Sequence, residues 1–177
     1  MSLNIVGGGP PMYDPAAVQP MRDELKAVGI EELLTAQSVD EALERPGTTL
    51  VVVNSVCGCA AGNARPGVML ALQNKVIPDR LTTVFAGMEK EAVARARGHM
   101  PEFPPSSPCI ALFKDGRAVK VLERHRIEGR GPLEIANELA SAFNEHCERP
   151  GPSIPREELE KIVPFQACGS SIPRFDG

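Results

Sequence analysis

The sequence lacks the features that mark exported, membrane-spanning and nucleic-acid-binding proteins. Its first residues, MSLNIVGGGPPMY, contain no basic stretch followed by an apolar one, so we expect no signal peptide and a cytoplasmic protein. No apolar run approaches the length that a membrane span needs, so we expect no membrane partner. The formal net charge of −4 is too small to indicate a nucleic-acid partner. With 42% hydrophobic and 24% charged residues, the composition is that of an ordinary globular protein.

The cysteines do not fit a fold that is held together by disulfides. There are five in 177 residues, an odd number, and a chain of this length can bury a core without such cross-links. We also expect no metal site, because there is no second close cysteine pair and His99, His125 and His146 lack zinc-finger spacing. Catalytic, redox-sensing or simply buried thiols are the remaining interpretations.

Turn residues and apolar patterns divide the chain into helices and strands. Asp14-Pro15 is a typical helix start, and the stretch from Ser38 to Glu41 has the form of a capping box that begins a second helix. The run TTLVVV is typical of a central strand that is buried on both faces. We expect helices at 15–29, 38–46, 60–73, 88–98, 132–147 and 156–163, and strands at 48–53, 81–86, 109–113 and 118–122.

This order of elements predicts an α/β protein with a thioredoxin-like fold. A strand–helix–strand unit followed by an antiparallel hairpin and a final helix gives a central mixed sheet of about four strands flanked by helices. We expect the domain to cover 14–147, with a flexible N-terminal arm at 1–13 and a C-terminal extension at 148–177. Pro66 must kink or break its helix. The core face of the last long helix is predicted to comprise Leu133, Ala136, Leu139, Ala140 and Phe143.

Cys57-Gly58-Cys59 lies where the central strand passes into a helix, a position at which α/β proteins concentrate function. The N-terminus of a helix stabilises a thiolate, the attacking species in disulfide exchange. We therefore predict that Cys57 attacks a disulfide and that Cys59 then releases the partner. Gly58 is expected to allow the backbone bend that so small a ring requires. A strained Cys-x-Cys disulfide would be easily reduced, which favours catalysis over structural bridging.

Other interpretations of the same residues remain open. Both cysteines could be buried thiols that pack as small hydrophobic groups, or the pair could sense oxidation without catalysing turnover. Cys59 and Arg65 also match C-x5-R, the phosphate-binding loop of tyrosine phosphatases and arsenate reductases. The C-x5-R interpretation is weakened by Pro66, which replaces the usual Ser or Thr and is expected to keep Arg65 out of a helical turn.

The segment VVVNSVCGCAAGNARPG, with PPSSPCIALFKDG and RHRIEG downstream, resembles the bacilliredoxin family over 15–147. These are thioredoxin-like proteins with a C-G-C active site. The resemblance implies that Cys57 removes bacillithiol from S-bacillithiolated proteins and that Cys59 or another thiol clears it. Reduction or isomerisation of protein disulfides is the neighbouring activity. The implied partners are proteins that carry such disulfides and bacillithiol as a thiol co-substrate, with no other cofactor.

The same resemblance assigns a substrate-binding role to Ser107 and Pro108, beside Gly58. They correspond to the cis-proline segment that faces the cysteines of thioredoxin-like proteins, where exposed backbone groups can pair with an extended substrate. Cys109 follows this proline where the family usually has Ser, so it is either an accessory thiol or a buried cysteine at a strand start.

The remaining candidates lie further along the chain. Arg124, His125, Arg126 and Arg130 form a basic stretch that either steers the carboxylates of bacillithiol or is a solvated surface. His125 can act as a proton shuttle only if it folds near Cys57. Cys168 is either a resolving thiol or an inert tail cysteine, and no role is expected for Cys147.

Overall fold

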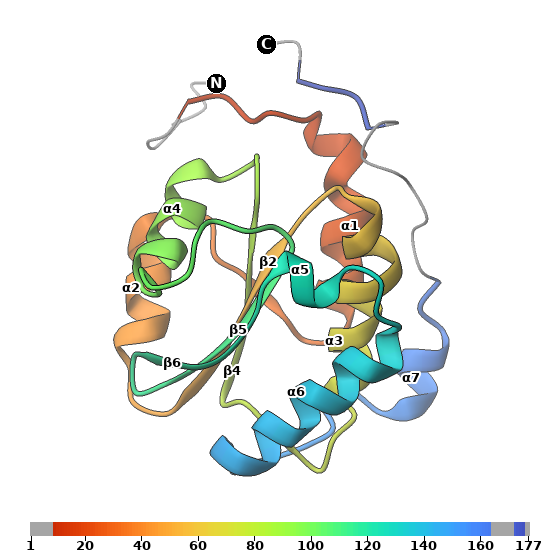
Figure 1. Cartoon of the computed structure of the whole chain (residues 1–177). Helices are drawn as coiled ribbons and strands as arrows, with labels where there is room; N and C mark the ends of the chain where they lie inside the picture. The colour runs from red at the N-terminus through yellow and green to blue at the C-terminus, as the bar shows by residue number, and fades with distance from the viewer. Residues whose placement is uncertain (1–8, 164–171, 176–177) are drawn as a thin grey trace.

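A mixed β-sheet forms the centre of the computed structural model, which describes residues 9–163 and 172–175 (Figure 1). Within these residues the sheet has five strands in the order β1-β4-β2-β5-β6. The first three are parallel to one another, whereas β5 is antiparallel to both of its neighbours, β2 and β6. The expected thioredoxin-like sheet is therefore confirmed, with one additional short strand. The strands are β1 (Glu31–Glu32), β2 (Thr48–Asn54), β4 (Arg80–Phe85), β5 (Cys109–Lys114) and β6 (Arg117–Leu122).

Strand β2 is central, as its β-branched run predicts. All seven of its residues are buried, and it pairs with β4 on one side and with β5 on the other. Because successive side chains point to opposite faces, Leu50 and Val52 enter one hydrophobic cluster while Val51 and Val53 enter another. Both faces of the sheet must therefore be covered by helices.

The helices form one layer on each face of the sheet (Figure 1). The cluster with Leu50 and Val52 also includes residues of the layer formed by α1, α3 and α6, and the cluster with Val51 and Val53 includes residues of α2 and α4. The result is a three-layer α/β/α arrangement. The helices are α1 (Pro15–Ala27), α2 (Ala36–Glu44), α3 (Arg65–Ala71), α4 (Lys90–Gly98) and α6 (Pro132–His146).

Local capping residues determine where α1 and α2 begin, and the predicted start of one of them is wrong. Asp14 caps α1 as predicted, since its carboxylate accepts a hydrogen bond from the amide of Ala16 at 2.8 Å. The predicted start of α2 at Ser38 is wrong. The hydroxyl of Thr35 accepts from the amide of Ser38, and the Ser38 hydroxyl accepts from the amide of Thr35, so the capping box lies earlier in the chain.

Pro66 is accommodated by a change of helix type. The segment η1 (Ala60–Ala64) is a π-helical turn that leads directly into α3, and the amide of Arg65 donates to the carbonyl of Ala60. Pro66 then occupies the start of α3, where its missing N–H group costs least. Arg65 itself has φ −60° and ψ −50°, so the expectation that Pro66 keeps Arg65 out of a helical turn is wrong.

The predicted core face of α6 is correct only in part. Ala136, Leu139 and Phe143 are buried, but Leu133 is 66% exposed and Ala140 is half-buried. Ile135 and Ala142 are buried in their place. The close approach of α3 sets this rotation, because a Cβ atom at Gly67 would lie 2.7 Å from Cγ2 of Ile135.

Several short elements complete the fold. The predicted hairpin turn is confirmed at Asp115 and Gly116, with φ values of 50° and 80°. The last predicted helix is also present, although shorter. A small second sheet and a helical turn within the charged stretch were not predicted. The predicted helix is α7 (Arg156–Glu160), and the unpredicted elements are β3 (Val76–Ile77), α5 (Arg124–Ile127) and β7 (Arg149–Pro150).

The two ends of the described chain meet beside α1. Tyr13 forms a β-bridge with Arg174, and Ile172 packs in a cluster that includes Val56 and Phe85. The division into an arm, a domain and an extension stays a prediction. Among the described residues, no helix has both the length and the apolar character needed to cross a membrane.

Candidate functional site

The two cysteines lie at the N-terminal end of a helical segment. Strand β2 ends at Asn54, and the carbonyl of Cys57 accepts hydrogen bonds from the amides of Ala60 at 3.1 Å and Ala61 at 3.2 Å. The sulfur atoms of Cys57 and Cys59 are 2.7 Å apart, and both residues are half-buried. The structure therefore places the pair at the strand–helix crossing that the sequence predicts.

The environment favours the protonated form of Cys59. Burial raises the pKa of the Cys59 thiol to about 11, and the hydrogen bond and negative charge of Cys57 act in the same direction. The positive charge of Arg124 opposes this shift. At neutral pH, Cys59 is therefore a thiol rather than a thiolate, which is compatible with its predicted role as the second thiol to react.

The backbone at Gly58 does not require glycine. Its φ is not in the left-handed region, and a Cβ atom built there would meet nothing within 4 Å. Both cysteines are free here, so the bend that a closed Cys57–Cys59 ring requires of Gly58 stays a prediction. Gly58 is exposed between the two half-buried cysteines, so its missing side chain leaves the approach to the sulfur atoms uncovered.

The proline segment lies at the same end of the sheet as the cysteines. Strands β2 and β5 are antiparallel, and Val53 pairs with Cys109. The end of β2 therefore runs beside the residues that precede β5. The Ser107–Pro108 peptide bond is cis, Ser107 is half-buried and Pro108 is buried. The segment that is predicted to bind substrate therefore lies at the same end of the sheet as Cys57.

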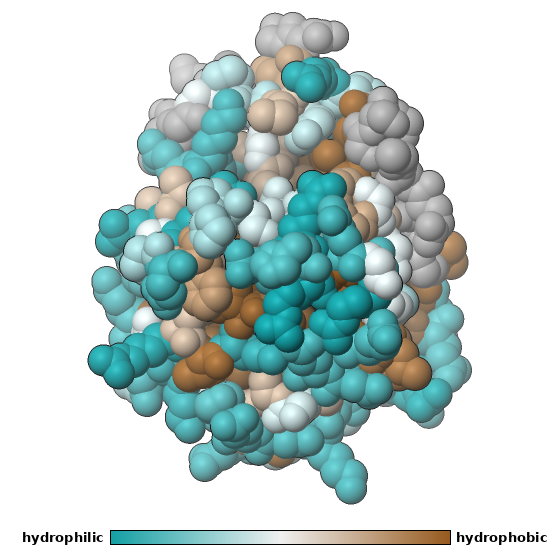
Figure 2. Space-filling model, in the orientation of Figure 1, coloured by the Kyte–Doolittle hydropathy of each residue, from teal (hydrophilic) through white to brown (hydrophobic). Residues whose placement is uncertain are grey.

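Arg124 approaches the cysteine pair through α5. Its amide donates to Oγ of Ser106 at 2.7 Å, which ties α5 to the proline segment. A hydrogen bond to Glu128 raises the pKa of Arg124, and the charges of Cys59 and Cys57 raise it further. A cavity of about 430 Å³ lies here, lined by residues 104–107 and 123–125. Figure 2 shows hydrophilic side chains gathered over α5.

The other arginines of the basic stretch share one carboxylate. Glu138 accepts from Arg126 at 2.9 Å and from Arg130 at 2.6 Å, and Lys120 also pairs with it. Arg124 therefore lies near the thiols, whereas Arg126 and Arg130 pair with Glu138 of α6. His125 is exposed and lines the cavity beside Ser107. A proton-shuttle role for His125 stays a prediction.

The structure places Cys109 in the core. It is 3% exposed and belongs to the cluster covered by α2 and α4. Burial raises the pKa of its thiol to about 12, with a smaller contribution from Glu123 and an opposing one from Arg97. Cys147 is also buried, which raises its pKa, and Cys168 lies outside the described residues. This placement of Cys109 matches the interpretation as a buried cysteine at a strand start.

Arg65 belongs to a buried ion pair that the sequence analysis did not predict. It is 1% exposed, and its guanidinium donates to Glu24 at 2.6 Å and to Asn54 and Ser55 at 3.0 Å each. A buried guanidinium held by a carboxylate does not favour the phosphate-binding interpretation of C-x5-R. The available signal was Glu24, a charged residue within the apolar face formed by Met21 and Leu25.

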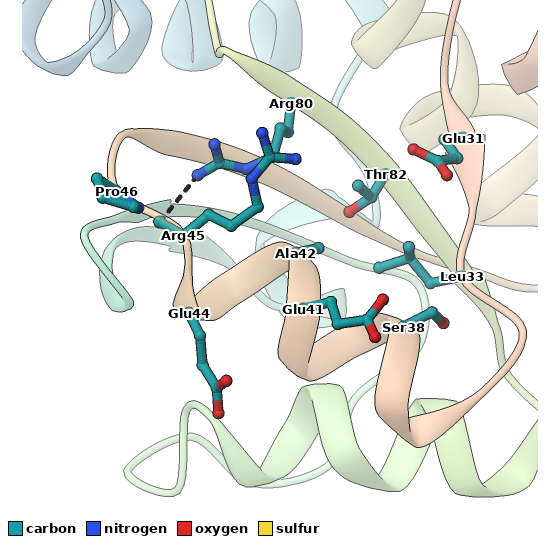
Figure 3. Close-up of a pocket in the computed structure, with 10 residues that line it drawn as sticks. All are labelled: Glu31, Leu33, Ser38, Glu41, Ala42, Glu44, Arg45, Pro46, Arg80 and Thr82. Carbon is teal, nitrogen blue, oxygen red and sulfur yellow. Dashed lines mark hydrogen bonds between the residues drawn. The ribbon is translucent and has the colours of Figure 1, made fainter.

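A further cavity of about 610 Å³ lies at the other end of the sheet (Figure 3). Arg80 begins β4, whereas Cys57 follows the last residue of the parallel strand β2. Arg45 and Arg80 lie together at one side of the cavity, and Arg80 donates to the carbonyl of Arg45 at 3.1 Å. This cavity is therefore separate from the cysteine pair.

Comparison with known proteins identifies relatives over most of the chain. Residues 13–147 match a family model described as Disulphide isomerase. Bacilliredoxins of Staphylococcus aureus strains NCTC 8325 / PS 47, bovine RF122 / ET3-1 and MRSA252 are each 49% identical over 137 residues. The match covers 77% of this chain and 94% of each relative. These matches support a thiol–disulfide redox function, and the chain belongs to the bacilliredoxin family.

Proposed function

We propose that this protein removes bacillithiol from S-bacillithiolated proteins by thiol–disulfide exchange at Cys57 and Cys59. The observation that carries the proposal is the contact between the two thiols at a helix N-terminus. Their sulfur atoms are 2.7 Å apart and lie at the end of the sheet where Pro108 precedes β5. Bacilliredoxin is also the name that the 49% identical relatives bear.

In the first step, the thiolate of Cys57 attacks the bacillithiol sulfur of the mixed disulfide. A new S–S bond forms between Cys57 and bacillithiol, and the old one breaks, so the substrate cysteine leaves as a thiolate and takes up a proton. The first unpaired N–H groups of a helix favour negative charge, which supports Cys57 as the attacking group. Cys59 competes weakly at neutral pH, because its raised pKa leaves little of it as thiolate.

In the second step, Cys59 loses its proton and attacks the sulfur of Cys57. The Cys57–Cys59 disulfide forms and bacillithiol leaves as a thiol. The contact between the two sulfur atoms makes this step intramolecular, so little translational freedom has to be lost. Arg124 assists by favouring the ionised form of Cys59. Two low-molecular-weight thiols, or one protein dithiol, then supply the two electrons and two protons that return the pair to its reduced form and are themselves oxidised to a disulfide.

We propose further that Gly58, Ser107 and Pro108 receive the substrate. The Ser107–Pro108 segment, which precedes β5, would offer backbone groups to an extended peptide, which adds affinity without demanding a particular side chain. The exposed backbone of Gly58 leaves room for a protein surface to approach. Reduction or isomerisation of protein disulfides is the second candidate activity, since the matching family model is described as Disulphide isomerase.

The test is the release of bacillithiol from a defined S-bacillithiolated protein by wild type, Cys57→Ser and Cys59→Ser. We expect wild type to release it, Cys57→Ser to be inactive and Cys59→Ser to accumulate bacillithiol on Cys57, which mass spectrometry detects. Cys147→Ser is the matched control, because that thiol is buried and should leave release unchanged. Equal activity of Cys57→Ser and wild type would contradict the assignment.

The same samples test the two alternative functions. A redox sensor would be oxidised once per molecule without turnover. A C-x5-R enzyme would hydrolyse p-nitrophenyl phosphate, and Arg65→Ala would abolish that hydrolysis. We expect multiple turnovers of the bacillithiolated protein and no phosphatase activity.

A further inference from the structure

A buried hydrogen-bond network connects Arg65 to the loop that carries Cys57. Oδ1 of Asn54 accepts from the amide of Ser55 at 2.9 Å and from Nη1 of Arg65 at 3.0 Å. Nη1 also donates to the carbonyl of Ser55 at 3.0 Å. The hydroxyl of Ser55 in turn accepts from the amide of Cys57 at 3.3 Å. Arg65 therefore holds the side chain of Asn54 and the backbone of Ser55, shortly before the first cysteine.

The other end of the network reaches α1. Nε of Arg65 donates to Glu24 at 2.6 Å, and the two side chains are 1% and 4% exposed. Nδ2 of Asn54 donates to the carbonyl of Met21 at 3.2 Å. The network thus joins α1, the end of β2 and the start of α3 beneath the cysteine pair.

Stability alone is a weak explanation for this ion pair. Removing two charges from water costs several kcal/mol each, and well-packed apolar side chains are often as stabilising as a buried pair. Arg65 adds to that cost, because its buried Nη2 has no hydrogen-bond partner among the described residues. What apolar residues would not supply is the pair of directed hydrogen bonds to Asn54 and Ser55.

We infer that Arg65 is a positioning residue, which holds the Asn54–Ser55 turn so that the sulfur of Cys57 lies against that of Cys59. The inference rests on the proposed exchange reaction at this pair. Arg65 acts on the pair through the Asn54 and Ser55 oxygen atoms that it holds by hydrogen bonds. Loosening the turn would lower the local concentration of one thiol around the other and so weaken their disulfide.

The equilibrium between the reduced pair and glutathione disulfide measures this effect directly. Formation of the Cys57–Cys59 bond removes two electrons and two protons from the pair, and one glutathione disulfide takes them up as two thiols. The equilibrium constant refers to folded protein at both ends, so a change in overall stability does not alter it. Bacillithiol is not involved, so the outcome is independent of the proposed substrate.

The informative variant is Arg65→Lys. A lysine ammonium is a point charge that can pair with Glu24. It cannot reproduce the planar guanidinium group, whose Nη1 atom also donates to Asn54 and Ser55. We expect the equilibrium constant to fall roughly tenfold, because the freed turn lowers the effective concentration of one thiol around the other. The pH midpoint of the exchange rate should stay at its wild-type value, because the charge is retained.

Arg22→Lys is the matched control. Arg22 is also mostly buried and pairs with Glu32 at 2.9 Å and with Glu89, while its guanidinium lies over Phe85. Its hydrogen-bond partners, Glu32 and Glu89, lie outside the Asn54–Cys57 loop. We expect this change to lower the unfolding free energy while leaving the disulfide equilibrium constant at the wild-type value.

Asn54→Ala removes a different member of the network and leaves the Arg65–Glu24 pair in place. It should weaken the disulfide in the same direction, and it tests the inference should Arg65→Lys fail to fold. A wild-type equilibrium constant in either folded variant overturns the positioning role. Failure of wild type to release bacillithiol, with a weakened disulfide in these variants, would reject the proposed substrate while supporting Arg65.

Discussion

The thiol of Cys59 is expected to react much more slowly in the folded protein than in the unfolded chain. Its pKa rises from 9.0 to about 11, so the thiolate fraction at neutral pH falls by roughly a hundredfold. A more basic thiolate is also a better nucleophile, which recovers part of the lost rate. We therefore expect alkylation of Cys59 by iodoacetamide to be slowed between about tenfold and a hundredfold near neutral pH.

Rates are measured on reduced protein in buffer and in guanidinium chloride, with mass-spectrometric fragment ions distinguishing Cys59 from Cys57. In the unfolded chain the rate should level off near pH 9, whereas in the folded protein it should still be rising at about pH 10. Circular dichroism at each pH verifies that the protein is folded.

The variant Cys57→Ala separates the causes of this shift. It removes the hydrogen bond and the charge of Cys57 but keeps the burial, which is the largest cause. The midpoint for Cys59 should therefore move down while remaining above 9.0. Equal rates for folded and unfolded wild type near neutral pH would refute this account of the site.

Three other changes have defined outcomes. Arg124→Gln should raise the pKa of Cys59 further and slow exchange by roughly twofold to threefold near neutral pH, a small effect because this arginine is half-exposed. Gly67→Ala should cost about 1–3 kcal/mol in urea unfolding, since its Cβ would lie 2.7 Å from Ile135. The unfolding free energy should fall as pH rises above 9.0, because unfolded Cys109 loses its proton near that pH and folded Cys109 only near 12, and Cys109→Ala should reduce this fall.

Each of these changes has its own control. Arg117→Gln lies at the far end of the β5–β6 hairpin and should leave the exchange rate unchanged. Gly62→Ala introduces a side chain with nothing within 4 Å, so equal losses at both glycines would refute the close α3–α6 contact. An unchanged slope of stability against pH in Cys109→Ala would show that this thiol is not the alkaline-sensitive group.

Much of the fold could be predicted because its signals are local. The run from Thr48 to Val53 identifies a doubly buried strand by itself, and Asp115-Gly116 supplies the φ > 0 residues that a tight hairpin needs. Strand β1 has only two residues and exists through its pairing with Thr82 and Thr83 of β4. No periodic pattern fits in so short a segment, so it could not be predicted.

The candidate site shows the same division between local and long-range information. The position of the cysteines follows from neighbouring residues. The partner of Arg65 does not, because Glu24 lies 41 residues earlier and only packing of α1 against the sheet brings it there. Arg124 likewise reaches the thiols through α5, a turn too short to leave an amphipathic pattern.

The π-helical turn η1 fixes the chain length between the cysteines and α3. A π turn contains more residues than an α turn, and each residue added to or removed from a helix rotates everything beyond it by about 100°. Deletion of Gly62 would therefore convert the π turn to an α turn and keep Arg65 facing Glu24 and Gly67 facing Ile135, whereas an inserted residue would rotate both away from these partners. A single-residue insertion should consequently be far less tolerated here than deletion of one residue of the turn.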